Sequence, residues 1–141
     1  MCGATESAAV SVTANVLSKS ICRFDSKNLS LDFGNVDPGS PADVTATGTI
    51  GFRCGGSARN AMFVLVDDGG LHETGPGSPR MQNTTRSAEH LPYSLALDPR
   101  NGTVPKNTNQ ILTVTATIRA TDFQGAPPGP YADTVVISIL P

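Results

Sequence analysis

Apolar and polar residues alternate with a period of two along several short segments of the chain. The alternation is clearest in residues 44–54 and 112–120, where threonines occupy most positions of one face and apolar side chains fill the other. Shorter runs at 29–33 and 93–97 show the same pattern, while residues 62–66 are apolar on both faces, as in a central strand. This period belongs to half-buried strands, and no segment keeps a helical period over ten residues. The pattern therefore predicts an all-β protein.

Clusters of Gly, Pro, Asn and Asp separate these segments and predict turns. They lie at residues 37–41, 67–70, 99–102 and 125–130. The polar stretch from Leu71 to His90 has no pattern and is expected to be a surface loop. Strands this short and this evenly spaced indicate a sandwich or a small barrel. From residue 22 onward we expect six strands, at 22–36 (with an interruption), 44–54, 60–67, 91–98, 110–120 and 131–140.

One further alternating segment, residues 9–17, precedes these six strands. Its apolar face consists of Val10, Val12, Ala14 and Val16. An immunoglobulin-like sandwich needs a seventh strand, and we expect none to follow the sixth. Two interpretations are open at this point: the segment completes its own domain, or it fills the groove of another copy by strand addition. The second would produce a head-to-tail filament.

Two of the three cysteines stand at the borders of predicted strands. Cys22 opens the first strand and Cys54, 32 positions later, closes the second. A bridge between them would fix the first strand to its neighbour, whereas the alternative is a pair of buried free thiols in a cytosolic protein. A Thr-rich β-domain with sparse charge favours an extracellular location and hence the bridge. Cys2 would then be free or form an intermolecular link.

Length and charge exclude several classes of function. The chain has 141 residues, which fits one domain with a real core. Its net charge is −2 and it has no basic cluster, so we expect neither a nucleic acid nor an anionic membrane as a partner. The first seven residues have neither the basic nor the apolar region of a signal peptide. Either the sequence is a mature form that restarts with Met1, or the protein stays in the cytosol.

The polar side chains form no pattern typical of catalysis. His72 and His90 fall in or beside the predicted loop and could meet Met81, but no metal-binding motif surrounds them, so we expect solvated histidines. Residues 67–70 lack the regularly alternating oxygens of a calcium loop and predict a turn. We therefore expect no enzyme activity, no catalytic residue, no metal, no cofactor and no small-molecule substrate.

The order of several short motifs resembles the spore coat protein U domain family, which includes the archaic chaperone–usher pilus subunits. Each motif alone is weak, but together they follow the order of the family and span nearly the whole chain. The chain departs from the family where Asn101-Gly102-Thr103 stands in place of the frequent Trp-Gly pair, and in lacking a second aromatic near Leu97. The motifs are Val10–Ala14 followed by Cys22, Leu31–Gly34 with Asp37-Pro38, Thr47–Ile50 running to Cys54, Arg80-Met81 with Leu91–Leu95 and Asp98, and Gly129–Val135.

The resemblance implies a fold and a mode of assembly. It implies the Cys22–Cys54 bridge and an incomplete, six-stranded immunoglobulin-like β-sandwich that the N-terminal donor strand of a neighbouring subunit completes. Residues 19–141 would form this domain, and residues 1–18 would carry a leader and the donor strand. The resemblance also implies secretion through the periplasm, capping by a periplasmic chaperone, and assembly by an outer-membrane usher into surface fibres that support adhesion or biofilm.

The final strand would have two roles. Tyr131, at its start, is expected to tie the preceding loop through its hydroxyl group, as tyrosine corners do. The strand would also flank the acceptor groove and pair with the chaperone. The residues expected to do so are Tyr131, Asp133, Val135, Ile137 and Ile139.

Other functions stay open beside the fibre subunit. One is a spore coat structural protein, which is the other known role in the family. Another is a surface-binding adhesin module that does not polymerise, although its donor-like strand favours a shaft subunit. A small periplasmic enzyme would need a clustered polar site that the sequence does not show.

Overall fold

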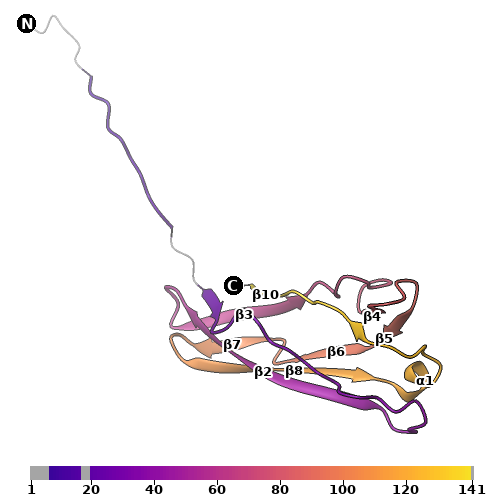
Figure 1. The fold of residues 1–141 in the computed structure, drawn as a ribbon. Helices are drawn as coiled ribbons and strands as arrows, with labels where there is room; N and C mark the ends of the chain where they lie inside the picture. Colours follow the sequence, from indigo (N-terminus) through magenta and orange to yellow (C-terminus); the bar gives the residue numbers. More distant parts are fainter. Residues whose placement is uncertain (1–6, 17–19, 141) are drawn as a thin grey trace, which may run out of the picture.

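The computed structural model describes residues 7–16 and 20–140, which form an immunoglobulin-like β-sandwich preceded by an extended segment (Figure 1). One sheet has the order β1-β2-β8-β6, and the facing sheet has the order β10-β3-β7. A small third sheet, β5-β4-β9, lies at the end of the molecule that carries the short helix α1. The elements are β1 (Ile21–Phe24), β2 (Val44–Gly55), β3 (Asn60–Asp67), β4 (Arg80–Asn83), β5 (His90–Pro92), β6 (Ser94–Asp98), β7 (Asn101–Pro105), β8 (Asn109–Ile118), α1 (Ala120–Phe123), β9 (Tyr131–Ala132) and β10 (Ile137–Leu140).

The core lies between the two larger sheets and continues toward α1. In the main cluster, the rings of Phe52 and Phe63 lie 5.0 Å apart between centroids, and Leu65 and Leu112 are fully buried beside them. A second cluster under α1 consists of Met81, Leu91, Ile118, Ala120 and Phe123. Among the described residues, no helix is long and apolar enough to cross a membrane.

Three of the predicted strands are confirmed almost to the residue. β2, β3 and β8 occupy the expected positions, and β2 pairs with β8 in antiparallel register from Val44 opposite Ile118 to Arg53 opposite Asn109. Two of the other three predicted strands are each divided. Residues 91–98 form β5 and β6 in different sheets, and residues 131–140 form β9 and β10 with four residues between them.

The predicted strand at 22–36 is wrong beyond its first residues. β1 ends at Phe24, and the chain then follows β2 without regular strand pairing. Side chains supply local bonds in place of a ladder: Ser26 Oγ accepts from the backbone N–H of Asn28, and Asp32 Oδ1 accepts from that of Gly34. Such bonds compete with sheet pairing, which explains the loss of the strand.

The polar stretch at 71–90 is not only a loop, because it contains β4. Met81 and Asn83 are buried there, and Asn83 Oδ1 accepts three bonds, from the backbone N–H groups of Thr85 and Arg86 and from the hydroxyl of Thr85. The predicted turn at 99–102 is also too long at its C-terminal end, because β7 already begins at Asn101. Residues 101–105 form β7, which pairs with β3.

Candidate functional site

An open groove of about 1250 Å³ runs along one side of the sandwich, between residues 24–38 and residues 126–137. Its lining is mostly apolar. The inward-facing side chains of β8 belong to the lining, together with side chains of β2, β5 and β6. These residues are Ile50, Leu91, Leu95, Leu112, Val114, Ala116 and Ile118.

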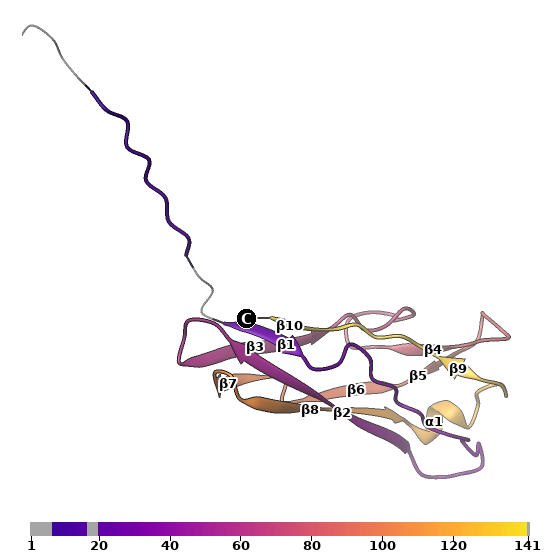
Figure 2. The ribbon, with the colours of Figure 1, turned by 60° about the vertical axis from the view of Figure 1, so that its left-hand side comes forward.

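The groove lies where the two sheets fail to meet. β1 is the edge of one sheet and β10 is the edge of the other, and each pairs with a single strand among the described residues. The two strands approach each other at the end of the molecule where the N-terminal segment leaves the domain (Figure 2). Because β1 and β10 are edge strands, the main-chain groups on their outer sides are available to an added strand. Toward α1 the two walls of the groove leave regular strand structure.

Gly48 in β2 allows the wall formed by residues 24–38 to lie close to this strand. A Cβ atom at Gly48 would lie 2.8 Å from Leu31 Cδ2 and 2.9 Å from Leu29 Cδ1. The two leucine side chains therefore rest on a position without a side chain, and Phe33 packs further along against the second core cluster. Side-chain packing, rather than a ladder of hydrogen bonds, holds this wall.

Two aspartates hold the other wall. Asp133 Oδ2 accepts from the Tyr93 hydroxyl over 2.6 Å, and its Oδ1 accepts from the backbone N–H groups of Leu71 and Thr134, both over 2.9 Å. Burial and the bond to Asp133 raise the pKa of Tyr93 well above its usual range, so the phenol keeps its proton. These bonds fix the segment between β9 and β10 beside the groove.

Asp68 makes the second attachment of this wall. Its Oδ1 accepts from the backbone N–H groups of Gly70 and Val136, and its own N–H donates to the Val136 carbonyl over 3.1 Å. The bonds from Gly70 and Val136 lower the pKa of Asp68 below its usual value. As expected from the sequence, the Tyr131 hydroxyl ties the preceding loop, because it donates to the Pro127 carbonyl over 2.7 Å.

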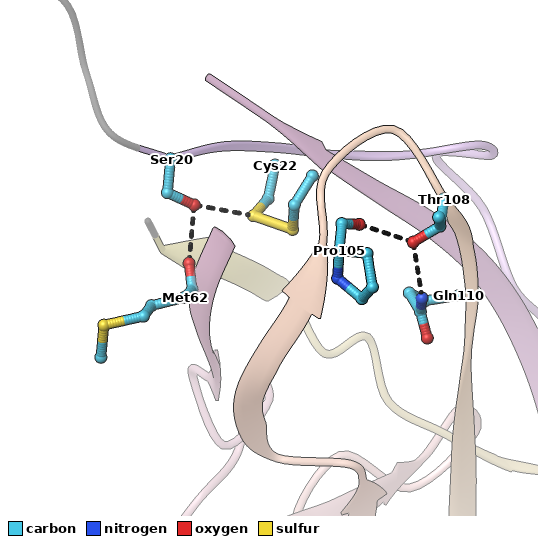
Figure 3. The surroundings of a disulfide bond; sticks show 7 residues. Ser20, Cys22, Met62, Pro105, Thr108 and Gln110 are labelled. Atoms are coloured by element: carbon cyan, nitrogen blue, oxygen red, sulfur yellow. Dashed lines mark hydrogen bonds between the residues drawn. A yellow bond between two sulfur atoms is a disulfide. The ribbon is translucent and has the colours of Figure 1, made fainter. Parts of the chain in front are cut away.

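The Cys22–Cys54 disulfide is formed, and the alternative of two free thiols is wrong. The two cysteines are directly opposite each other in β1 and β2, with their Cα atoms 4.0 Å apart. Next to the bridge, the Ser20 hydroxyl donates to the Met62 carbonyl of β3 over 2.6 Å (Figure 3). Both sheets therefore hold the point at which the N-terminal segment leaves the domain.

The structure brings the final-strand residues to the groove but leaves the predicted donor residues outside it. Tyr131, Asp133, Val135 and Ile137 line the groove, and Ile139 packs against the main core cluster. In contrast, the side chains of Val10, Val12 and Val16 are 82%, 88% and 92% exposed, and Ala14 is exposed as well. Residues 7–16 run away from the sandwich without strand structure (Figure 1), whereas residue 17 of the predicted strand, and Cys2, lie outside the described residues.

The arrangement offers shape and unpaired edges rather than reactive groups. The rings of His72 and His90 do approach each other, with centroids 5.7 Å apart, but Met81 is buried in the second core cluster. In residues 7–16 and 20–140, no three His, Cys, Asp or Glu side chains are grouped so that they could hold a metal ion. The groove is therefore suited to bind an extended, apolar strand. Sequence reasoning missed much of its lining, such as Phe123 and Ala126, because only the tertiary fold brings these residues beside the final strand.

Comparison with known proteins gives one informative match. A family model described as the Spore Coat Protein U domain matches residues 6–138. A search of the curated proteins finds no match. Thirteen chains of solved structures match, among them one from a structure described as "Chaperone-tip adhesin complex is vital for synergistic activation of CFA/I fimbriae biogenesis". That chain is 13% identical with a TM-score of 0.47, over 87% of the present chain but only 41% of its own length, and a likeness at this level identifies no function.

Proposed function

The chain belongs to the Spore Coat Protein U domain family, and we propose that it is a structural subunit of a bacterial surface fibre. The fibre is of the archaic chaperone–usher type. Each subunit passes through the periplasm with a chaperone, reaches the surface through an outer-membrane usher, and supports adhesion or biofilm. The observation that carries the proposal is an open apolar groove in the same chain as an exposed, alternating apolar segment.

The donor segment matches the groove in length and in period. Val10 to Val16 comprises seven residues, as does the wall from Tyr131 to Ile137, and the segment would span about 20 Å as a strand, at about 3.3 Å per residue. In an extended conformation the four apolar side chains of the segment point to one side. They would face the floor of the groove, while the backbone pairs with the walls on its two sides.

The expected gain from insertion is large. Full burial of the three valine side chains contributes about 5–8 kcal/mol before main-chain hydrogen bonds are counted, and part of this offsets the entropy lost on association. Because the contacts along both edges must break together, dissociation should be slow. A fibre built in this way should survive mild detergent.

The direction of insertion determines how subunits are arranged. β10 runs toward the end of the molecule that carries the disulfide, away from α1. A donor strand antiparallel to β10 therefore has its Val10 side near the disulfide and its Val16 side near α1 of the acceptor. The domain that follows Val16 then lies beyond the α1 end. Repetition of this contact does not close on itself, so the product is a filament.

A spore coat assembly could use the same contact between subunits. The test therefore distinguishes a polymerising subunit, whether of a fibre or of a coat, from a binding module that does not polymerise. Purified, oxidised protein is run on SDS gels with and without boiling, beside the variants Val12→Asp and Ser11→Asp. Both variants add one charge to the segment, but residue 12 faces the groove and residue 11 faces outward. We expect a ladder that collapses on boiling for the parent chain and for Ser11→Asp, and monomer alone for Val12→Asp. A folded parent chain that runs only as monomer would contradict the proposal and favour the binding module.

A further inference from the structure

We infer that successive subunits also bind each other through two oppositely charged ends of the domain. This inference rests on the proposed function, because it concerns the contact that strand donation creates. The basic pole comprises residues 20–23, 53–60 and 105–109 around the disulfide. The acidic pole comprises residues 37–43, 84–90 and 119–124 around α1.

The basic pole carries four cations and no acidic residue. Arg23 and Arg53 are opposite each other in β1 and β2, and the Lys106 backbone N–H donates to the Arg59 carbonyl over 3.1 Å. These four residues are exposed, and neither ion pair found in the described part of the chain involves any of them. The nearest acid, Asp25, follows the end of β1. The basic pole therefore has a formal charge of +4, which no ion pair among the described residues offsets.

The acidic pole carries four acids and two cations, so its formal charge is 2 − 4 = −2. The turn at 37–43 is held to α1, because Asp43 Oδ1 accepts from the Ala120 backbone N–H and Gln124 donates to the Ser40 carbonyl. Arg119 is already paired with Asp122 at 3.6 Å. The four acids are Asp37, Asp43, Glu89 and Asp122, and the cations are Arg86 and Arg119.

The connection between donor strand and domain is too short to keep the poles apart. Residues 16 and 20 are four positions apart in the chain, so their Cα atoms can be separated by at most about 14 Å. The basic pole of each subunit must therefore lie beside the point where its donor strand leaves the acceptor. With insertion antiparallel to β10, that point is the acidic pole. Insertion in the other direction would place two basic poles face to face, where like charges repel.

The charged poles would act mainly on the rate and direction of assembly. Exposed charges steer encounter and suppress wrong orientations more than they add to affinity. Salt screens them over about 8 Å at physiological ionic strength. A shaft of these subunits should therefore assemble fastest at low salt, and a donor peptide that carries no pole should be insensitive to the pole charges.

The test compares two reactions of the full chain. Polymerisation after dilution from denaturant is followed at about 20 mM and about 500 mM salt. Binding of a labelled peptide of residues 7–19 is measured in the Val12→Asp chain, which should stay monomeric. The variants reverse the basic pole from +4 to −2 (Arg23→Glu, Arg59→Glu and Lys106→Glu), or combine this reversal with Glu89→Lys and Ala88→Lys, which bring the acidic pole from −2 to +1. A control, Thr49→Glu with Thr115→Glu, adds negative charge to the sheet midway between the poles.

We expect reversal of the basic pole to slow polymerisation about tenfold at low salt and much less at high salt. The combined variant should recover most of the rate, and the control should match the parent. All chains should bind the peptide alike, which shows that their grooves are intact. If the peptide binds but neither charge nor salt alters polymerisation, the pole contact is refuted and strand donation stands. If the peptide binds no chain, strand donation itself is refuted and the pole contact with it.

Discussion

Removal of the disulfide should cost the domain much of its stability. Cys22 and Cys54 close a loop of 32 residues, and the chain-entropy relation for a loop of that length gives about 12 cal/mol/K, or about 3.7 kcal/mol at 25 °C. Cys54 is fully buried, so its replacement by alanine adds a small packing loss. We expect the double variant Cys22→Ala/Cys54→Ala to lose about 4 kcal/mol of the free energy of unfolding.

Urea unfolding of the Val12→Asp chain measures this loss without interference from polymerisation. The oxidised Val12→Asp chain is compared with the same chain carrying the two alanine substitutions and with the same chain under reducing conditions. The losses of unfolding free energy in these two comparisons should agree. Replacement of Cys2 by serine is the matched control and should not move the midpoint. For a domain of this size, about 4 kcal/mol corresponds to a fall in Tm of roughly 12–20 °C.

A loss below about 1 kcal/mol would contradict the expected contribution of the disulfide to stability. It would mean that the unfolded chain already keeps Cys22 and Cys54 close together without the bridge, so the bridge removes little entropy from it. In that case the wall of the groove that begins at β1 would not depend on the disulfide. The assembled ladder of the double variant would then be unchanged as well.

Three further perturbations concern the walls of the groove. The folded domain keeps the Tyr93 proton, whereas the unfolded chain loses it near pH 10. The contribution of Tyr93 to the free energy of unfolding is therefore complete below pH 10 and falls as the pH rises above it. A Tyr93→Phe chain should lose about 1.5–2 kcal/mol at pH 7 and show a flatter alkaline decline in urea midpoints. Because the pKa of Asp68 is lowered in the folded domain, its carboxylate contributes stability that is complete above pH 3.8, the usual pKa, and is lost as the pH falls further. Asp68→Asn should therefore flatten the decline of urea midpoints at acid pH. Gly48→Val should displace the wall at residues 25–36 and weaken binding of the 7–19 peptide at least tenfold in a fluorescence titration, while circular dichroism still reports a folded domain.

Strands that bury one face along their whole length could be predicted from the sequence. In β2 and β8, alternating threonines face outward and the residues between them face the core, so the period of two is uninterrupted. The turn predicted at 37–41 lies just before β2, as expected. The Cys22–Cys54 bridge and the bond of the Tyr131 hydroxyl were also predicted correctly, because the two cysteines lie in neighbouring strands and Pro127 is only four residues before Tyr131.

Other parts of the fold depend on contacts that the pattern does not carry. β4 has four residues, and one of its two buried side chains is Asn83, whose polar bonds are satisfied by the following turn. The wall at 25–36 alternates like a strand but rests on Gly48 through its leucines, and only the fold brings these segments together. The groove itself is a gap between two sheet edges far apart in sequence. Local periodicity could indicate that a strand was missing, but not which side chains would line its place.

The most direct test of the central claim uses the Val12→Asp chain as a terminator. Such a subunit keeps its groove and can accept a strand but cannot donate one, so in a linear head-to-tail fibre it can occupy only one end. Tagged Val12→Asp chain is mixed with parent chain in increasing proportion before refolding, and the unboiled ladder and the tag content of each band are measured. We expect the ladder to shorten with dose and every band to contain at most one tag. Bands with several tags, or a ladder of unchanged length, would show that subunits do not assemble through this strand.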